Sequence, residues 1–170
     1  SEDAIEGLPE PIFTLPTEDE RTAQAVDPTQ LAKFRTDLLL AVNNARKVAR
    51  TCGTTAYPAV PALTANAKLD TSSQVHAANM AAKNFFSHTG LDGKSPFDRM
   101  KAAGYSFSYA GENIAAGNST VTATMTQWLN SAGHCANIMN KNFTQIGFGY
   151  DYGAASTYKH YWVQNFGKPL

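Results

Sequence analysis

The sequence predicts one α+β domain that follows an acidic N-terminal arm. Apolar residues recur at helical spacing in several segments between residues 29 and 130, whereas residues 146–166 alternate with the period of two that marks β-strands. Helices followed by a terminal pair of strands, without alternating β-α-β units, are typical of the α+β class. The length of 170 residues and the hydrophobic fraction of 43% suffice for one sizeable core.

Residues 1–28 form the arm, and residues 29–170 form the domain proper. The arm has eight carboxylates against Arg21 alone, which gives a formal charge of −7, and the rest of the chain balances it at +7. Four of the eight prolines lie in the arm. Proline fixes φ and removes a donor, so an extended arm or linker is expected. Its apolar residues, Ile12 and Phe13 among them, are unusual for a free tail, and we expect the arm to lie against the basic domain.

Four helices are expected in the first part of the domain. The first begins near Pro28, with Asp27 or Thr29 as a suitable N-cap, and ends before Cys52, with Gly53 as a suitable stop. Its apolar stripe consists of Leu31, Phe34, Leu38, Val42, Ala45 and Val48 or Ala49. The other three helices are expected at about residues 66–84, 95–103 and 119–130.

Two strands close the chain. Ile146, Phe148 and Tyr150 alternate along the first strand, and residues 158–166 alternate along the second. Residues 151–156 between them are typical of a hairpin loop.

Composition excludes two function classes. Lysine and arginine are scattered singly, with no run and no aromatic interleaving, so a nucleic-acid partner is not expected. No stretch approaches the roughly 18 apolar residues of a membrane span. The chain opens with Ser-Glu-Asp and shows no signal-peptide pattern.

Three segments place titratable residues among glycines and aromatics, and all three are expected to be loops. They contain His88, Glu112 and His134, and Glu112 is the only glutamate after residue 20. Two histidines and one carboxylate form a recognised metal constellation with open positions, although imidazole suits several metals. The alternative is that both histidines bond backbone carbonyls. A serine hydrolase with Ser87 or Ser131 as the nucleophile beside His88 or His134 is a further alternative. The sequence has no Gly-x-Ser-x-Gly elbow, however.

The two cysteines, Cys52 and Cys135, lie 83 positions apart and lack the close spacing of a zinc site. They are either two buried thiols or one disulfide. A bridge that closes so long a loop stabilises the fold by about 4–5 kcal/mol in the chain-entropy model.

Taken together, these segments resemble the CAP superfamily of cysteine-rich secretory, antigen 5 and pathogenesis-related class one proteins (SCP domain). The resemblance runs from about Leu31 to Gly167 and looks like the bacterial branch. It is carried by FFSHTGLDGKSPFDRM, AGYSFSYAGENIAAG, WLNSAGHCANIMNKNFTQIGFGY and YWVQNFG, in that order.

The resemblance implies a three-layer α-β-α sandwich around an antiparallel sheet, in a protein that is secreted, extracellular or periplasmic. It implies a central cleft in which His88, Glu112 and His134 hold a divalent cation such as zinc. The second glutamate of eukaryotic members has no match after Trp128, so a three-residue site with weaker or pH-dependent metal binding is expected. The resemblance also favours a disulfide between Cys52 and Cys135.

The family has no common reaction. We therefore expect a binding or effector module for an apolar small molecule, such as a sterol or fatty acid, or for a protein partner. The alternative is a metal-assisted, protease-like hydrolase with metal-bound water as nucleophile and Glu112 as ligand or base.

Overall fold

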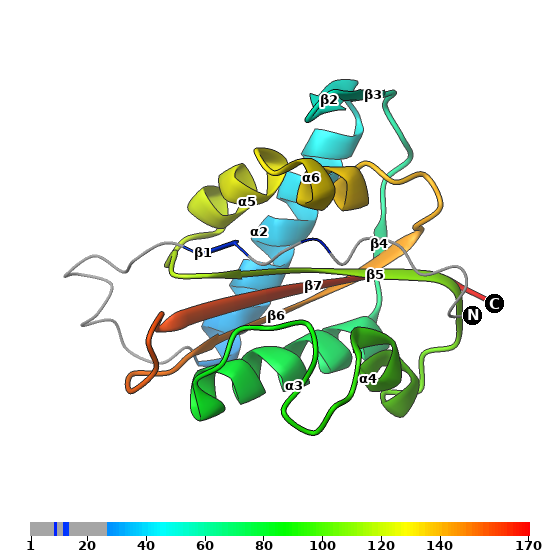
Figure 1. Cartoon of the computed structure of the whole chain (residues 1–170). Coiled ribbons are helices and arrows are strands. Elements are labelled where there is room, and N and C mark those ends of the chain that lie inside the picture. Colours follow the sequence, from blue (N-terminus) through cyan, green and yellow to red (C-terminus); the bar gives the residue numbers. More distant parts are fainter. Residues whose placement is uncertain (1–8, 10–11, 14–26) are drawn as a thin grey trace.

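The computed structural model describes residues 9, 12–13 and 27–170, which form three layers (Figure 1). Helices α2, α5 and α6 cover one face of a central sheet, and α3 and α4 cover the other. The helices are α2 (Pro28–Arg46), α3 (Ala67–Lys83), α4 (Pro96–Ala102), α5 (Val121–Leu129) and α6 (Ala132–Ile138). The strands are β1 (Ile12–Phe13), β2 (Arg50–Cys52), β3 (Thr55–Tyr57), β4 (Thr64–Ala65), β5 (Phe107–Ala116), β6 (Gln145–Tyr152) and β7 (His160–Pro169).

The sheet has the order β1-β5-β7-β6-β4. Its three long strands are antiparallel, and β7 pairs with β5 on one side and β6 on the other. The two short edge strands, β1 and β4, pair in parallel with β5 and β6. The expected α-β-α sandwich is therefore confirmed, with parallel pairs added at both edges.

The larger core lies between the sheet and the layer of α2, α5 and α6. Leu38 and Val42 of α2 pack there with aromatic residues of β6 and β7. Both tryptophans are fully buried in it. Trp128 donates from Nε1 to the carbonyl of Ile114, so α5 is fixed to β5, and the ring of Trp162 lies 4.3 Å from that of Tyr150.

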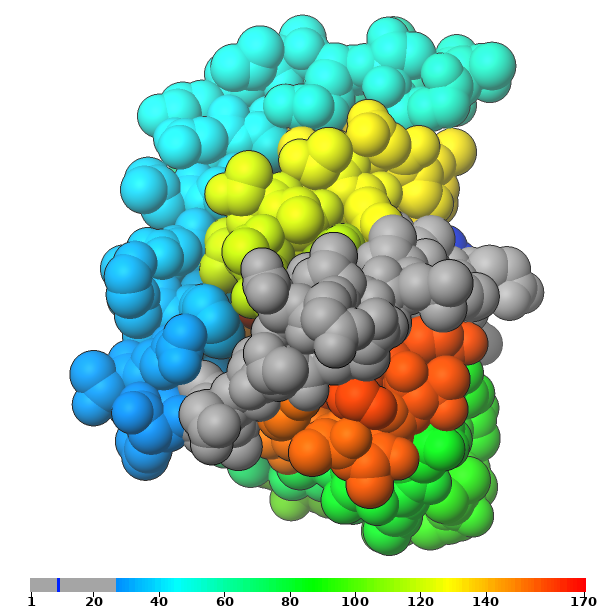
Figure 2. Space-filling model, turned by 90° about the vertical axis from the view of Figure 1, so that its left-hand side faces the viewer, coloured from blue at the N-terminus to red at the C-terminus, as the bar shows by residue number. Residues whose placement is uncertain are grey.

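The opposite layer approaches the sheet more closely because β6 presents glycines to α3. A Cβ on Gly147 would lie 2.1 Å from the backbone of Leu69, and one on Gly149 would lie 2.5 Å from that of Ser73. Helix α3 therefore rests backbone to backbone on β6. In Figure 2 the orange residues around the β6–β7 loop lie between the yellow residues of α5 and α6 above and green residues below.

The first helix begins as predicted, because Asp27 is the N-cap and accepts from the amide of Gln30. Its end differs from expectation, since the helix stops at Arg46 and Val48 and Ala49 lie beyond it. Gly53 is not the stop of the helix but lies in the turn of the β2–β3 hairpin, with a φ of +60°. The β-branched run around this glycine favours a tight hairpin over a continued helix. None of the helices in the described part is long and apolar enough to cross a membrane.

Candidate functional site

Glu112 lies on strand β5 and is fully buried. The expectation of a loop was wrong here, because residues 107–116 pair along β7, with Glu112 opposite Asn165. The period of two is absent because residues 110–116 are all buried, and a strand covered on both faces does not alternate. The strand therefore carries a carboxylate into the middle of the fold.

His88 reaches this carboxylate from the segment between α3 and α4. Its Nδ1 lies 2.8 Å from Glu112 Oε1, and its Nε2 lies 2.7 Å from the carbonyl oxygen of Pro9. A carboxylate and a carbonyl only accept hydrogen bonds, so both ring nitrogens act as donors and the ring is an imidazolium. Burial lowers the pKa of His88, but the hydrogen bond and charge of Glu112 outweigh burial and raise it above the usual value.

Arg99 of α4 supplies the second cation. Its Nη2 donates to Glu112 Oε2 at 3.0 Å and to the carbonyl of His88 at 2.9 Å. Burial raises the pKa of Glu112, yet the bond from His88 and the surrounding positive charge lower it to about 2. Sequence reasoning missed Arg99. A buried carboxylate requires a charged partner, but the pattern does not say which cation reaches it.

A polar chain continues from the carboxylate into α3. Asn165 Nδ2 donates to Glu112 Oε2 at 2.9 Å, and Ser72 Oγ donates to Asn165 Oδ1 at 2.6 Å. Nearby on α3, His76 Nε2 bonds the carbonyl of Ser87 at 2.7 Å and so holds the segment that carries His88. Every oxygen of the carboxylate thus has a fixed donor.

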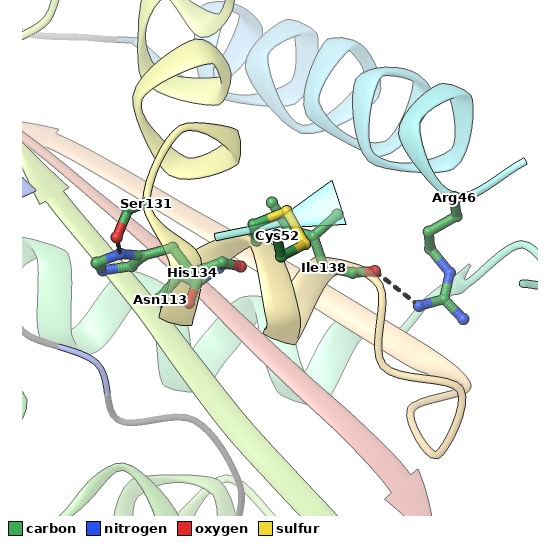
Figure 3. Close-up of a disulfide and its surroundings, with 7 residues drawn as sticks. Arg46, Cys52, Asn113, Ser131, His134 and Ile138 are labelled. Atoms are coloured by element: carbon green, nitrogen blue, oxygen red, sulfur yellow. Dashed lines mark hydrogen bonds between the residues drawn. A yellow bond between two sulfur atoms is a disulfide. The ribbon is translucent and has the colours of Figure 1, made fainter. Parts of the chain in front are cut away.

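His134 lies on α6, where a loop had been expected, and it is fully buried. Ser131 Oγ lies 2.7 Å from its Nδ1, whereas its Nε2 has no hydrogen-bond partner in the described part of the chain (Figure 3). Burial, and then the charge of His88, lower the pKa of His134 to about 4. The ring is therefore neutral, and its tautomer decides whether Nδ1 accepts from the serine hydroxyl or donates to it.

Three side-chain amides connect His134 to the carboxylate strand. Asn113 Nδ2 donates to the carbonyl of His134 at 3.1 Å and to Gln164 Oε1 at 3.0 Å. Asn137 Nδ2 donates to Asn113 Oδ1 at 2.9 Å and to the carbonyl of Glu112 at 3.3 Å. The structure therefore bonds His88 directly to Glu112, while His134 is joined to the same strand through its backbone.

The disulfide between Cys52 and Cys135 is present, as the resemblance implied. It links the β2–β3 hairpin to α6, one residue after His134 (Figure 3). Arg46 holds the C-terminal end of α6, since its Nη1 donates to the carbonyl of Ile138 at 2.8 Å. The helix that carries His134 is thus held at its middle and at its C-terminal end.

These residues, as arranged, do not fit a divalent cation. Within residues 9, 12–13 and 27–170, no group of three or more His, Cys, Asp or Glu side chains could hold a metal ion. Both oxygens of Glu112 already bond His88, Arg99 or Asn165, and a guanidinium 3.0 Å away repels a second cation. Of the three expected ligands, only His134 has a ring nitrogen without a hydrogen-bond partner among the described residues. Metal binding stays a prediction.

Comparison with known proteins agrees with the motifs. The family model of the cysteine-rich secretory protein family, CAP, matches residues 39–166. The YkwD protein of Bacillus subtilis is 46% identical over 82 residues, which are 48% of this chain and 32% of YkwD. The membrane protein YlbC of the same organism is 36% identical over 91 residues, 54% of this chain and 24% of YlbC. The chain thus spans a third or less of these relatives.

Two solved structures share the architecture. One is an extracellular protein of Bacillus anthracis that contains an SCP domain, with a TM-score of 0.68 and 26% identity over 86% of this chain and 45% of that one. The other is an outer surface protein of Borrelia burgdorferi, with a TM-score of 0.71 and 21% identity over 88% of this chain and 100% of that one. The second likeness concerns the fold alone. Since the family model covers most of the chain, this protein belongs to the CAP family of cysteine-rich secretory proteins.

Proposed function

We propose that this chain is a secreted binding module in which the cluster of His88, Glu112 and Arg99 holds a ligand by hydrogen bonds and does not turn over a substrate. The observation that carries this proposal is the saturation of Glu112, whose two oxygens accept from His88, Arg99 and Asn165. A carboxylate with a pKa near 2 and three fixed donors is a poor general base at neutral pH.

His88 Nε2 is the donor that meets an acceptor from outside the cluster, the carbonyl of Pro9. Arg99 Nε has no hydrogen-bond partner among the described residues, but it is buried. An imidazolium whose Nδ1 is bonded to a carboxylate has a fixed orientation, and its Nε2 is a strong donor for a carbonyl oxygen. The cluster is therefore suited to recognition of carbonyl groups such as those of a peptide backbone.

Two observations support an extracellular setting. The chain closes its two cysteines into a disulfide, and structural disulfides persist in oxidising compartments. The similar Bacillus anthracis protein is described as extracellular.

An apolar small molecule is the second candidate ligand, and a different surface favours it. A shallow groove between α2 and α5 is lined by Leu40, Val121 and Met125, with polar residues such as Asp37 and Thr122 beside them. Leu40 is 62% exposed, so its side chain is open to an apolar ligand in this groove. A fatty acid such as palmitate fits this chemistry, and Leu40→Asp should abolish its binding while Leu91→Asp, at an equally exposed leucine, should not.

The decisive test of the main proposal uses casein as an extended probe. The intact oxidised protein is incubated with casein, with zinc or with a chelator, and cleavage is followed by mass spectrometry. We expect intact casein in every condition, and we expect millimolar casein peptides to shift the His88 Nε2–H signal in NMR spectra. Cleavage that disappears in His88→Ala and in chelator would establish the hydrolase instead, and an unmoved His88 signal would contradict binding at this cluster.

A zinc titration by calorimetry tests the charge argument separately. Weak binding or none is expected in the parent, because Arg99 neutralises the carboxylate. Arg99→Met removes the competing cation, so zinc should bind this variant more tightly than the parent. One zinc bound tightly by the parent and lost in His88→Ala would show that the guanidinium moves aside for a metal.

A further inference from the structure

We propose that the edge of β5 and the hollow beside α6 form a groove for an extended, acidic, proline-containing peptide strand, and that the arm occupies this groove through Pro9, Ile12 and Phe13 as an intramolecular ligand. The inference deepens the proposed binding function and rests on it. Three contacts from separate parts of the fold carry it.

The first contact is the bond from His88 Nε2 to the carbonyl of Pro9, at 2.7 Å. It joins residues 79 positions apart, and the acceptor is a backbone group that any residue supplies. A backbone acceptor fixes where the strand lies without fixing its sequence, as is usual when a strand is added to a sheet edge.

The second contact is the packing of Pro9 on Gly133 of α6. A Cβ on Gly133 would lie 2.6 Å from Pro9 Cβ, so the ring of the proline fills the space that a side chain would need. Both residues line a hollow of about 630 Å³, together with Tyr57, Val60 and Met139. The hollow extends beyond Pro9 and offers apolar surface to a peptide side chain.

The third contact is the pairing of β1 with β5. Ile12 and Phe13 pair in parallel with Ala115 and Ala116, three and four residues beyond Glu112 on the same strand. Within the described residues, β1 covers only these two positions of a ten-residue strand. A short parallel pair adds few hydrogen bonds, so an added strand of better register can replace it.

Charge favours an acidic occupant. The arm of residues 1–28 has a formal charge of −7 and the rest of the chain one of +7. Tethering keeps such an arm at a millimolar effective concentration, so a ligand from another molecule must compete with it.

The test releases the arm without altering the domain. A specific protease site replaces residues 17–24 of the full chain, and the folded protein is cut there. A labelled synthetic peptide of residues 1–16 is then added, and fluorescence anisotropy is measured. We expect saturable binding to the cut protein, at least tenfold weaker binding to the uncut protein, and at least tenfold weaker binding of a scrambled peptide of equal charge.

Gly133→Ala is the matched variant. Gly133 lies in α6, and its φ is not in the left-handed region. Alanine has a higher helix propensity than glycine, so the variant should raise the melting temperature of the cut protein from which the arm has been removed. In the uncut protein it should lower the melting temperature, because the methyl group displaces Pro9. Peptide binding should fall at least tenfold.

Three outcomes would overturn the inference: no binding of the peptide, equal binding of the scrambled peptide, or unchanged binding by Gly133→Ala. If casein peptides shift the His88 signal while the arm peptide fails to bind, the binding function survives and the strand groove alone is wrong.

Discussion

At the scale of single residues, the centre of the molecule shows how a carboxylate survives full burial. Glu112 is surrounded by a guanidinium, an imidazolium and an amide, each held in turn by a backbone carbonyl or another side chain. An ionised carboxylate without such partners would take up a proton instead. The cost of this arrangement is that the same partners occupy the positions at which a metal or a substrate proton would have to bind.

His134 differs, because its burial favours the neutral ring. Its pKa of about 4 lies below the 6.5 of an unfolded chain, so the unfolded state binds more protons between these values. Unfolding free energy should therefore fall as the pH drops from 6.5 toward 4, by up to about 3 kcal/mol. The lowered pKa of His76 acts in the same direction.

Urea unfolding at about pH 6.5, 5.5 and 4.5 checks this expectation. In that window His88 contributes its full stabilisation. The pKa of His88 is raised by folding, so its contribution to the unfolding free energy is lost only when the pH rises above 6.5. The contribution of Glu112 is lost only as the pH falls from about 4.5 toward 2. His134→Asn should show a smaller loss than the parent, and equal slopes would contradict the account.

At the scale of elements, the contact between α3 and β6 depends on the absence of side chains. Gly147→Ala places a methyl group against the backbone of Leu69, which cannot move like a flexible side chain. We expect a loss of about 3 kcal/mol or more in unfolding free energy. Gly93→Ala is the control, because no atom lies within 4 Å of its Cβ and only its φ of +82° opposes the change.

Chemical denaturation of both variants measures the difference. Gly93→Ala should lose about 1 kcal/mol through backbone strain. A Gly147→Ala protein no less stable than Gly93→Ala would show that α3 can shift away from the sheet.

The helices that the sequence predicted well have one buried face and one exposed face. Residues 66–84 expose one stripe and bury another, so the period of α3 is visible, and the same holds for α4 and α5. Strands β6 and β7 are buried on both faces, but large aromatic residues recur at every second position and made them visible. Strand β5 is buried in the same way and lacks such aromatics around its Gly-Glu-Asn triplet, so it was taken for a loop. Helix α6 was missed because seven residues are too few to show a helical period.

The candidate site was predictable only where its residue types, histidine and glutamate, are rare in the sequence. His88, Glu112 and His134 stood out among glycines, and the structure brings the first two into direct contact. Arg99 looked like an ordinary surface cation on a short helix, and Pro9 looked like part of a linker. Their roles depend on contacts across 13 and 79 positions, which no local pattern reports.

At the scale of the whole molecule, the disulfide joins two parts of one face. It closes a separation of 83 positions and should stabilise the fold by about 4–5 kcal/mol in the chain-entropy model. For a chain of this size that loss lowers the melting temperature by roughly 10–15 °C. The double variant Cys52→Ser/Cys135→Ser, studied by calorimetry, checks this value.

The reduced parent is the control, because it has the same open connection without a changed side chain. It should melt near the double variant and far below the oxidised parent. An unchanged melting temperature in both would show that packing of the hairpin on α6 suffices, and that the bridge does not anchor the helix of His134.

The two buried tryptophans give the protein a reporter of its own. Trp128 of α5 is bonded to Ile114 of β5, and Trp162 belongs to β7. Both indoles therefore contact strands that carry residues of the polar centre. Indoles shielded from water emit at shorter wavelengths than hydrated ones. Native emission should therefore be strongly blue-shifted, and a red shift on acidification, reduction or release of the arm would follow the loosening of this centre in real time without any attached dye.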